Sequence, residues 1–253
     1  RVAVTLLEDP AGTVVVTRLT AYLLLFVASV SLTYYTIQNS RQRTIRSEMW
    51  GYVILAGIAG ALYGVTGIAE VIAAAEVVVA DIGFVGSIRR LCQLFFIIFL
   101  ALAMRELYFE SPQATGDRGV DLPISIESIR WIEAGFLFIA FLQFMVIILL
   151  DLVNVTIIVQ LAASIGFTAY GVSFASRIKG AAMSSRTVLD TMLTYIIAIL
   201  LSAGGASAVE VGVLVGIQSA LVESLSVVLT IMSITFLLVL TTRLKQNVAD
   251  VSV

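Results

Sequence analysis

The chain of 253 residues contains no histidine and only one cysteine, and each shortage removes a class of function. Without histidine, the usual histidine-based metal sites, histidine catalytic bases and haem b ligation are excluded. The single thiol, Cys92, cannot form an internal disulfide and belongs to no CxxC motif. No nucleophile–base pair, metal-ligand cluster or phosphate-binding loop is visible in the sequence, so we expect a protein that is not an enzyme and uses no cofactor.

Charged residues are also scarce. They make up 13% of the chain, whereas hydrophobic residues make up 60% and the mean hydropathy is +1.05. A soluble domain carries about a quarter charged residues, so this chain cannot present a water-covered surface. The net charge of −2 and the scattered basic residues give no indication of nucleic-acid binding. The composition predicts an integral membrane protein whose main partner is the lipid bilayer.

Seven apolar runs are long enough to cross a bilayer, since a helical span needs about 20 apolar residues. They lack the alternation of membrane strands, and backbone groups in hydrocarbon must be paired within their own segment. We therefore predict an all-α bundle of seven transmembrane helices forming one domain over residues 1–253. The predicted spans are Leu19–Ile37, Trp50–Glu70, Asp81–Met104, Trp131–Leu150, Val153–Phe174, Val188–Ala203 and Gln218–Thr242.

The segments between the spans predict the orientation of the bundle. We expect residues 1–18 to lie outside the bilayer, residues 105–130 to form the longest loop and residues 243–253 to form a tail. Lysine and arginine concentrate in cytoplasmic loops of membrane proteins. In this chain they concentrate in the first connection, the fifth connection and the tail: Arg41, Arg43, Arg46, Arg177, Lys179, Arg186, Arg243 and Lys245. The N-terminus is thus predicted outside and the C-terminus in the cytoplasm, across a cell membrane taken to be a prokaryotic plasma membrane.

The second predicted span carries a face of glycines at helical spacing: Gly57, Gly60, Gly64 and Gly67. Gly60 and Gly64 form a GxxxG pair, which lets a neighbouring helix approach closely. We expect this face to pack against another helix of the same chain. The alternative is contact with a partner membrane protein or with a second copy in a homo-oligomer.

Two adjacent arginines, Arg89 and Arg90, interrupt the third span about 12 Å below its outer end, at 1.5 Å rise per residue. An arginine near the bilayer centre costs at least about 2.5–3.5 kcal/mol, so it normally faces a partner, the bundle interior or water. The alternative is a shorter span, Leu91–Leu107, preceded by an interfacial or re-entrant helix over Glu70–Ile88. Both arginines would then lie at the mouth of the bundle and bind lipid phosphate.

Other polar residues fall at a similar predicted depth, and Glu223 is the acid best placed to be the counter-ion of the arginines. Unpaired charges at that depth would be very unfavourable. The predicted ligand or ion-pair layer consists of Arg89, Arg90, Gln93, Gln143, Gln160 and Glu223. A purely structural hydrogen-bond network is the alternative reading of the layer. We expect Glu70 and Glu133, at the ends of their helices, to be hydrated caps.

The seven-helix order resembles that of the microbial rhodopsins, as do three short matches: Ala80-Asp81, residues 195–207, which end near the pair Gly204-Gly205, and Leu-Thr-Thr-Arg at 240–243. The residues 195–207 look like the sixth helix and following loop of that family. The family holds retinal on a lysine in its last helix. Aligned on Arg243, this chain has Ile234 at that position and Thr230 at the position of a partner aspartate. The resemblance implies an opsin-like scaffold that does not bind retinal covalently.

Three functions are compatible with these features. The seven-helix layout and the polar layer favour a receptor-like or signal-relay protein. A small-ion or anion transporter or channel would use Arg89 or Arg90 to bind an anion and Glu223 to gate it. A non-catalytic subunit of a larger membrane complex is favoured by the glycine face. A cavity that reaches Arg89 from one side would favour the receptor, and water pathways from both sides would favour transport.

Overall fold

The computed structural model describes residues 10–42, 48–75, 82–110, 126–150, 153–181 and 188–251, and its regular elements in these ranges are all helical. This confirms the all-α prediction. The elements are α2 (Pro10–Gln42), α3 (Glu48–Ala74), α4 (Ile82–Glu110), α6 (Ile126–Leu150), α7 (Val153–Ala181), α8 (Val188–Glu210), the 3₁₀ turn η2 (Val211–Val213) and α9 (Ser219–Val251).

Six of the described helices, α2, α3, α4, α7, α8 and α9, are long and apolar enough to cross a membrane. The other long helix, α6, has 25 residues, and its apolar run Trp131–Ile147 is 17 residues long. Several long apolar helices in one chain are the signature of a multi-pass membrane protein.

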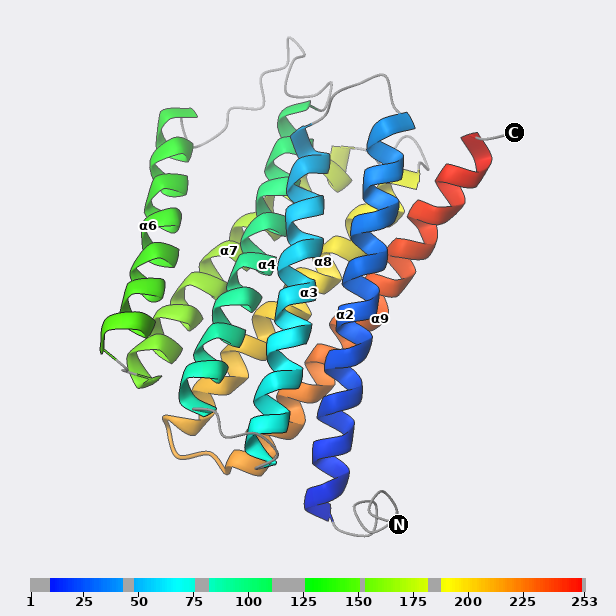
Figure 1. Ribbon diagram of the computed structural model, residues 1–253. Helices are drawn as coiled ribbons and strands as arrows, with labels where there is room; N and C mark the ends of the chain where they lie inside the picture. Colours follow the sequence, from blue (N-terminus) through cyan, green and yellow to red (C-terminus); the bar gives the residue numbers. More distant parts are fainter. Residues whose placement is uncertain are drawn as a thin grey trace.

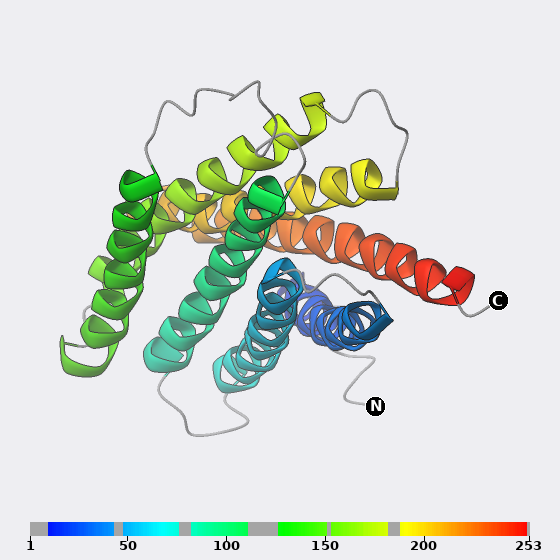
Figure 2. The ribbon, with the colours of Figure 1, turned by 90° about the horizontal axis from the view of Figure 1, so that it is seen from above.

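Successive helices run in opposite directions, so the start of α2 and the end of α9 lie at opposite ends of the bundle (Figure 1). We call these the N-terminal end and the C-terminal end. Helix α3 packs against α2 and α4, α4 against α7, α8 against α9, and α9 against α2. Seen from above, α6 stands at the edge of this arrangement, beside α7 and α4 (Figure 2). The N-terminal end therefore gathers the ends of α3 and α8 and the starts of α2, α4 and α9.

The middle of α4 forms the core of the bundle because neighbouring helices cover it on several sides. Its side chains from Leu94 to Met104 are largely buried, and Leu94, Ile97, Leu100, Ala101 and Met104 are inaccessible to solvent. Between Arg90 and Arg105 the sequence holds one amide side chain, Gln93, and no charge. The centre of α4 is thus an apolar segment with charged groups at both ends.

The described helices extend beyond several predicted spans, and α8 shows the reason. The predicted span ended at Ala203, before the pair Gly204-Gly205, but α8 continues to Glu210. Gly204 faces Thr168 of α7 so closely that an added Cβ would overlap that side chain. The glycines therefore serve close packing within a helix, and the expectation of a loop at this point was wrong. Residues 1–9 and 111–125, and Asp81, lie outside the described residues.

The glycine face of α3 lies mainly against α2. A Cβ on Gly64 would come within 2.9 Å of backbone atoms of Tyr22 and Phe26, and one on Gly60 within 2.6 Å of the Ser29 hydroxyl. Gly57 and Gly67 make equally close approaches to the Thr33 and Tyr22 side chains. This face is thus occupied by a helix of the same chain, which brings α2 close enough for its Arg18 to reach the end of α3.

Candidate functional site

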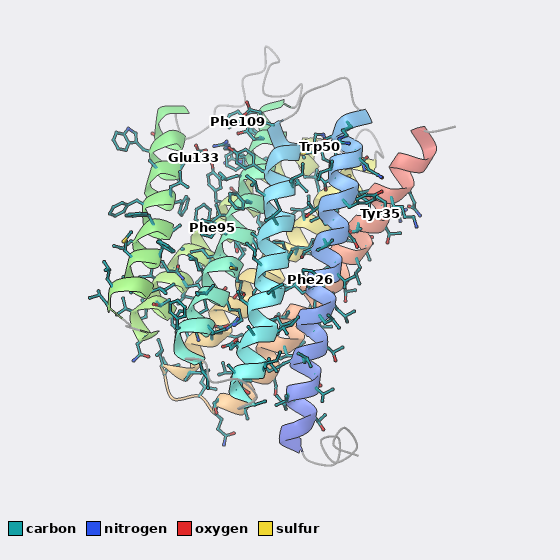
Figure 3. The ribbon with its side chains drawn as sticks, viewed as in Figure 1. Phe26, Tyr35, Trp50, Phe95, Phe109 and Glu133 are labelled. Carbon is teal, nitrogen blue, oxygen red and sulfur yellow. The ribbon has the colours of Figure 1, made fainter. Side chains whose placement is uncertain are left out.

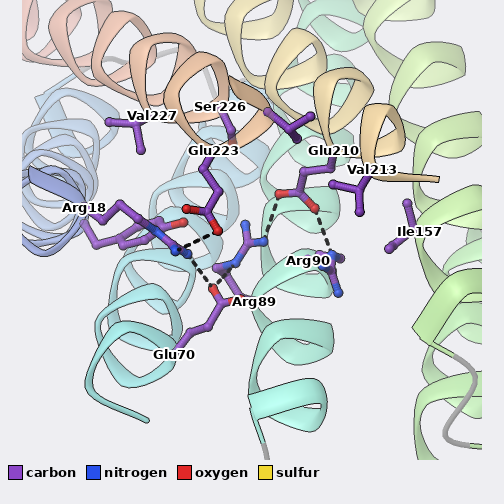
Figure 4. Close-up of a pocket in the computed structure, with 12 residues that line it drawn as sticks. Arg18, Glu70, Arg89, Arg90, Ile157, Glu210, Val213, Glu223, Ser226 and Val227 are labelled. Atoms are coloured by element: carbon purple, nitrogen blue, oxygen red, sulfur yellow. Dashed lines mark hydrogen bonds and ion pairs between the residues drawn. The ribbon is translucent and has the colours of Figure 1, made fainter. Parts of the chain in front are cut away.

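A charged cavity of about 160 Å³ opens at the N-terminal end of the bundle. It lies among the ends of α2, α3, α4, α8 and α9, with one residue from α7 (Figure 4). Three of its side chains are arginines and three are glutamates, so their formal charges cancel. The lining consists of Arg18, Tyr22, Glu70, Arg89, Arg90, Ile157, Glu210, Val213, Val222, Glu223, Ser226 and Val227.

The charged side chains form one continuous chain of alternating ion pairs. The Arg89 guanidinium is central, with Nε 2.5 Å from a Glu70 oxygen and Nη2 2.8 Å from a Glu210 oxygen. The other Glu210 oxygen lies 2.8 Å from Nε of Arg90. Arg18 lies 3.6 Å from Glu70 and 3.8 Å from Glu223. The ion pairs of this network therefore link α2, α3, α4, α8 and α9.

Helix geometry explains how both adjacent arginines reach Glu210. Consecutive residues point about 100° apart on a helix, so one partner between them must present two separate acceptors. Glu210, at the last residue of α8, offers one carboxylate oxygen to each guanidinium. Glu70 approaches α4 at Gly86, where a Cβ would lie 2.8 Å from its Oε1 atom. The missing side chain at Gly86 thus makes room for the acid that pairs with Arg89.

The predicted counter-ion of the arginines was wrong. Their described ion pairs are with Glu70 and Glu210, whereas Glu223 pairs with Arg18. Glu223 does line the same cavity, but its side chain is 48% exposed and stands nearer the mouth. Glu70 is not a simple hydrated cap either, because its side chain is 12% exposed and its carboxylate contacts Arg89. Helix α4 begins at Ile82 and is continuous through both arginines, and Glu70 lies in α3, so Glu70–Ile88 is not one separate helix.

Gln93 and Gln160, two members of the predicted layer, form the floor beneath the arginines. Gln93 is one helical turn below Arg89 and donates to the Ala203 carbonyl at 3.1 Å. Gln160 donates to the Gln93 side-chain oxygen at 3.2 Å and to the Ser207 hydroxyl at 3.5 Å. These bonds tie α4, α7 and α8 together directly below the cavity.

The side chains around Gln93 leave little empty space. The next cavity inward, bordered by Gln93, Tyr63 and Ser233, has a volume of about 10 Å³. A cavity needs about 10–15 Å³ to hold one water molecule. It therefore has room for about one water molecule. Gln93 and Gln160 do not line the charged cavity themselves, and they lie between it and the apolar centre of α4.

Gln143 does not join this layer through a hydrogen bond. It lies on α6 and is fully buried, and neither atom of its amide has a hydrogen-bond partner within the described part of the chain. Helix α6 stands at the edge of the bundle and contacts α7 and α4, so the Gln143 amide lies away from the helices α8 and α9 that border the charged cavity.

A second cavity, of about 350 Å³, adjoins the charged one. It is bordered by the starts of α2 and α9 and the end of α3, and it shares Arg18 and Glu223 with the charged cavity. Its other lining residues are small or apolar: Val14, Val15, Val71, Ala74, Ala220 and Ser224. We call it the vestibule, because the Arg18–Glu223 pair stands between it and the inner cavity.

A separate charged cluster lies toward the C-terminal end of α4. Arg105 pairs with Glu106 and with Glu133 of α6, and its guanidinium lies 5.9 Å from the Tyr52 ring centroid. Glu133 lies near the same end of the bundle as Trp50 and Phe109 (Figure 3). The expectation that Glu133 is only a hydrated cap was wrong, since it links α6 to α4. Arg105 is 16 residues from Arg89, or about 24 Å along the helix.

Among the described residues, no group of three or more cysteine, aspartate and glutamate side chains could hold a metal ion. The acids of the charged cavity are instead paired with arginines. No protein-family model, curated protein or solved structure matches this chain.

Proposed function

We propose that this protein is a receptor-like membrane protein that receives a small polar ligand in the charged cavity and relays its binding through the bundle without catalysing a reaction. The observation that carries the proposal is the one-ended form of the cavity. Charged groups line the cavity, the hydrogen-bonded pair Gln93–Gln160 lies on its inner side, and the apolar centre of α4 follows. A dead-end site of this kind suits recognition better than passage.

The orientation that we propose directs the cavity outward. Arg41, Arg177, Arg243 and Lys245 belong to the C-terminal end, opposite the cavity, and such residues favour the cytoplasmic side. With α6 as a further span, the helices cross seven times, placing the N-terminus outside and the C-terminus in the cytoplasm of a cell membrane. The ligand then enters from the external solution.

The ion-pair network supplies a physical route for the relay. Arg89 and Glu210 each bridge two partners, so a ligand that competes for one of these groups changes the balance of the others. The affected groups belong to five helices that extend to the C-terminal end. A ligand can shift a conformational equilibrium only by its difference in affinity for the two states, and displaced ion pairs provide such a difference.

Transport is the second candidate, and the Arg105 cluster is the observation that favours it. A cavity of about 80 Å³ borders Arg105 and Glu133 at the C-terminal end. Two charged cavities separated by an apolar segment could open alternately. In that mechanism, the charged cavity would become accessible from both sides of the membrane.

Cysteine labelling distinguishes the two candidates. The only native thiol is removed by Cys92→Ala, and Ser226→Cys then places one thiol in the lining of the cavity. Proteoliposomes with the full chain are treated with a membrane-impermeant methanethiosulfonate from the outside, the inside, or both. We expect labelling only from the side that faces the N-terminal end.

Ser233→Cys is the matched control because it lies on the same face of α9, seven residues further along. Its hydroxyl is buried against that of Ser202 at 2.7 Å, so we expect no labelling from either side. Labelling of Ser226→Cys from both sides would refute the receptor and support transport. Protection of Ser226→Cys from both sides would refute an open ligand cavity.

A further inference from the structure

We infer that the ligand of the charged cavity is a small zwitterion of the amino-acid class, with one carboxylate and one ammonium group. This inference rests on the proposed function, since it names the chemistry that the same cavity would recognise. Three features carry it: a buried guanidinium donor without an acceptor, a carboxylate held only loosely, and the exact cancellation of charge among the lining side chains.

The anionic group of the ligand is assigned to the arginines. Arg89 is 4% exposed, and its Nη1 atom has no hydrogen-bond partner among the described residues, although its other two nitrogens contact glutamates. The guanidinium lies between the carboxylates of Glu70, Glu210 and Glu223 in the centre of the cavity (Figure 4). A buried donor without an acceptor is unfavourable, and planar guanidinium groups bind carboxylates well. Arg90, on the next position of the helix, adds a second positive charge.

The cationic group of the ligand is assigned to Glu223. Among the described residues, Glu70 and Glu210 each pair with two arginines, whereas Glu223 pairs with one, Arg18, at 3.8 Å. Its side chain is 48% exposed, so its carboxylate retains free acceptor sites near the mouth. An ammonium group is a compact cation with three donors and suits such an acceptor. The arginines below and the glutamate above thus offer the two charges in a fixed order.

The charge balance and the volume of the charged cavity narrow the class of ligand further. Three arginines and three glutamates sum to zero, so a ligand without net charge leaves the low-dielectric end of the bundle neutral, whereas a simple anion or cation does not. A cavity of about 150 Å³ can hold a molecule as large as benzene, so one of 160 Å³ accepts roughly six to ten non-hydrogen atoms. Ile157, Val213 and Val222 line it beside the charges, which suits a short apolar side chain.

The vestibule explains how such a ligand would enter. It opens onto the inner cavity at Arg18 and Glu223, whose ion pair is the longest in the network. The ligand's ammonium replaces Arg18 at Glu223, and its carboxylate then displaces the side chains that cover the buried Nη1 atom of Arg89. Entry therefore opens the loosest pair and leaves the short Arg89–Glu70 and Arg89–Glu210 pairs in place.

The test uses the Cys92→Ala/Ser226→Cys protein in nanodiscs of phosphatidylglycerol and measures the rate of thiol labelling with three probes of similar size. L-alanine carries both charges, propionate lacks the ammonium and ethylammonium lacks the carboxylate. We expect alanine to slow labelling in a saturable manner, and each single-charge probe to need a concentration at least about tenfold higher for the same protection. Glu223→Gln should remove the preference for alanine over propionate. The same substitution at Glu48, exposed at the opposite end of the bundle, should leave it unchanged.

Equal protection by propionate and alanine would overturn the zwitterion and assign a simple anion. Protection that appears when phosphatidylethanolamine is added to the nanodiscs, with none from alanine, would overturn the free solute and assign a zwitterionic lipid head group. One-sided labelling of the proteoliposomes, together with no protection by any probe in the nanodiscs, would refute the ligand class while leaving the proposed one-ended cavity intact. Labelling of the proteoliposomes from both sides would refute the proposed function itself.

Discussion

Glu210 is the side chain on which the charged network depends most, and its replacement by glutamine tests the network directly. One carboxylate of Glu210 neutralises two guanidinium groups, those of Arg89 and Arg90, at 2.8 Å each. Glutamine retains the shape and one acceptor oxygen but removes the charge. Arg89 would keep Glu70, whereas Arg90 would lose the glutamate with which it pairs.

The expected magnitude follows from burial. Removal of one partner from a buried ion pair costs about 3–5 kcal/mol, because a charge is left uncompensated. A chain of about this size loses about 2–4 °C in Tm per kcal/mol, so Glu210→Gln should lower Tm by roughly 6–20 °C. Glu223→Gln is the matched substitution at an exposed pair, where ion pairs contribute only about 0–1 kcal/mol. Its Tm should change by no more than about 4 °C.

Thermal unfolding in mild detergent, followed by far-UV circular dichroism, compares the two variants. Arg90→Gln in the Glu210→Gln background should recover part of the lost stability, since it removes the unpaired charge. Equal and small effects of Glu210→Gln and Glu223→Gln would refute the reasoning, because they would show that Arg89 and Arg90 are compensated by water. If the Glu210→Gln/Arg90→Gln double variant had a lower Tm than Glu210→Gln alone, the ion pair between Glu210 and Arg90 would be refuted.

Two further predictions concern glycines, and circular dichroism of thermal unfolding checks both. Gly64→Ala should destabilise the bundle by about 1–3 kcal/mol because its Cβ would press on the backbone near Phe26, whereas Gly51→Ala, with no atom within 4 Å, should be neutral or slightly stabilising. If Gly64→Ala and Gly51→Ala changed stability equally, α2 would be able to move away from α3 without loss of stability. Gly86→Ala should displace the Glu70 carboxylate, so it should lower stability less when Glu70 has already been replaced by alanine. If the effects of Gly86→Ala and Glu70→Ala on stability simply add, the contact between these residues would be contradicted.

Hydropathy predicted most of the fold because the bilayer imposes length and backbone pairing on each segment. It could not predict where α8 ends. Gly204 and Gly205 resemble a helix stop in the sequence, but both lie inside α8, where Gly204 packs closely against Thr168. That error of seven residues placed Glu210 in a connection, when it is the last residue of a helix that faces the arginines.

The candidate site was predicted in part for the same physical reason. Depth along a helix can be counted from the sequence, so Arg89 and the Gln93–Gln160 layer were found at related levels. Rotation about each helix axis depends on packing, and the sequence alone does not determine it. The surroundings of Gln143 and Glu223 therefore differ from those predicted. A usable signal for Glu70 was Gly86, whose missing side chain leaves room for an acid on the neighbouring helix.

The bundle itself indicates that the charged cavity is not needed to hold the helices together. Along the middle of α4, from Leu94 to Met104, helix association is achieved by apolar side chains alone. Interhelical hydrogen bonds in a membrane average only about 0.6 kcal/mol, and buried ion pairs can often be replaced by apolar residues without loss. Six charged groups at one end are thus an inefficient way to gain stability. In the receptor that we propose, they have a different role: they are a neutral set of separated charges whose partners a small ligand exchanges.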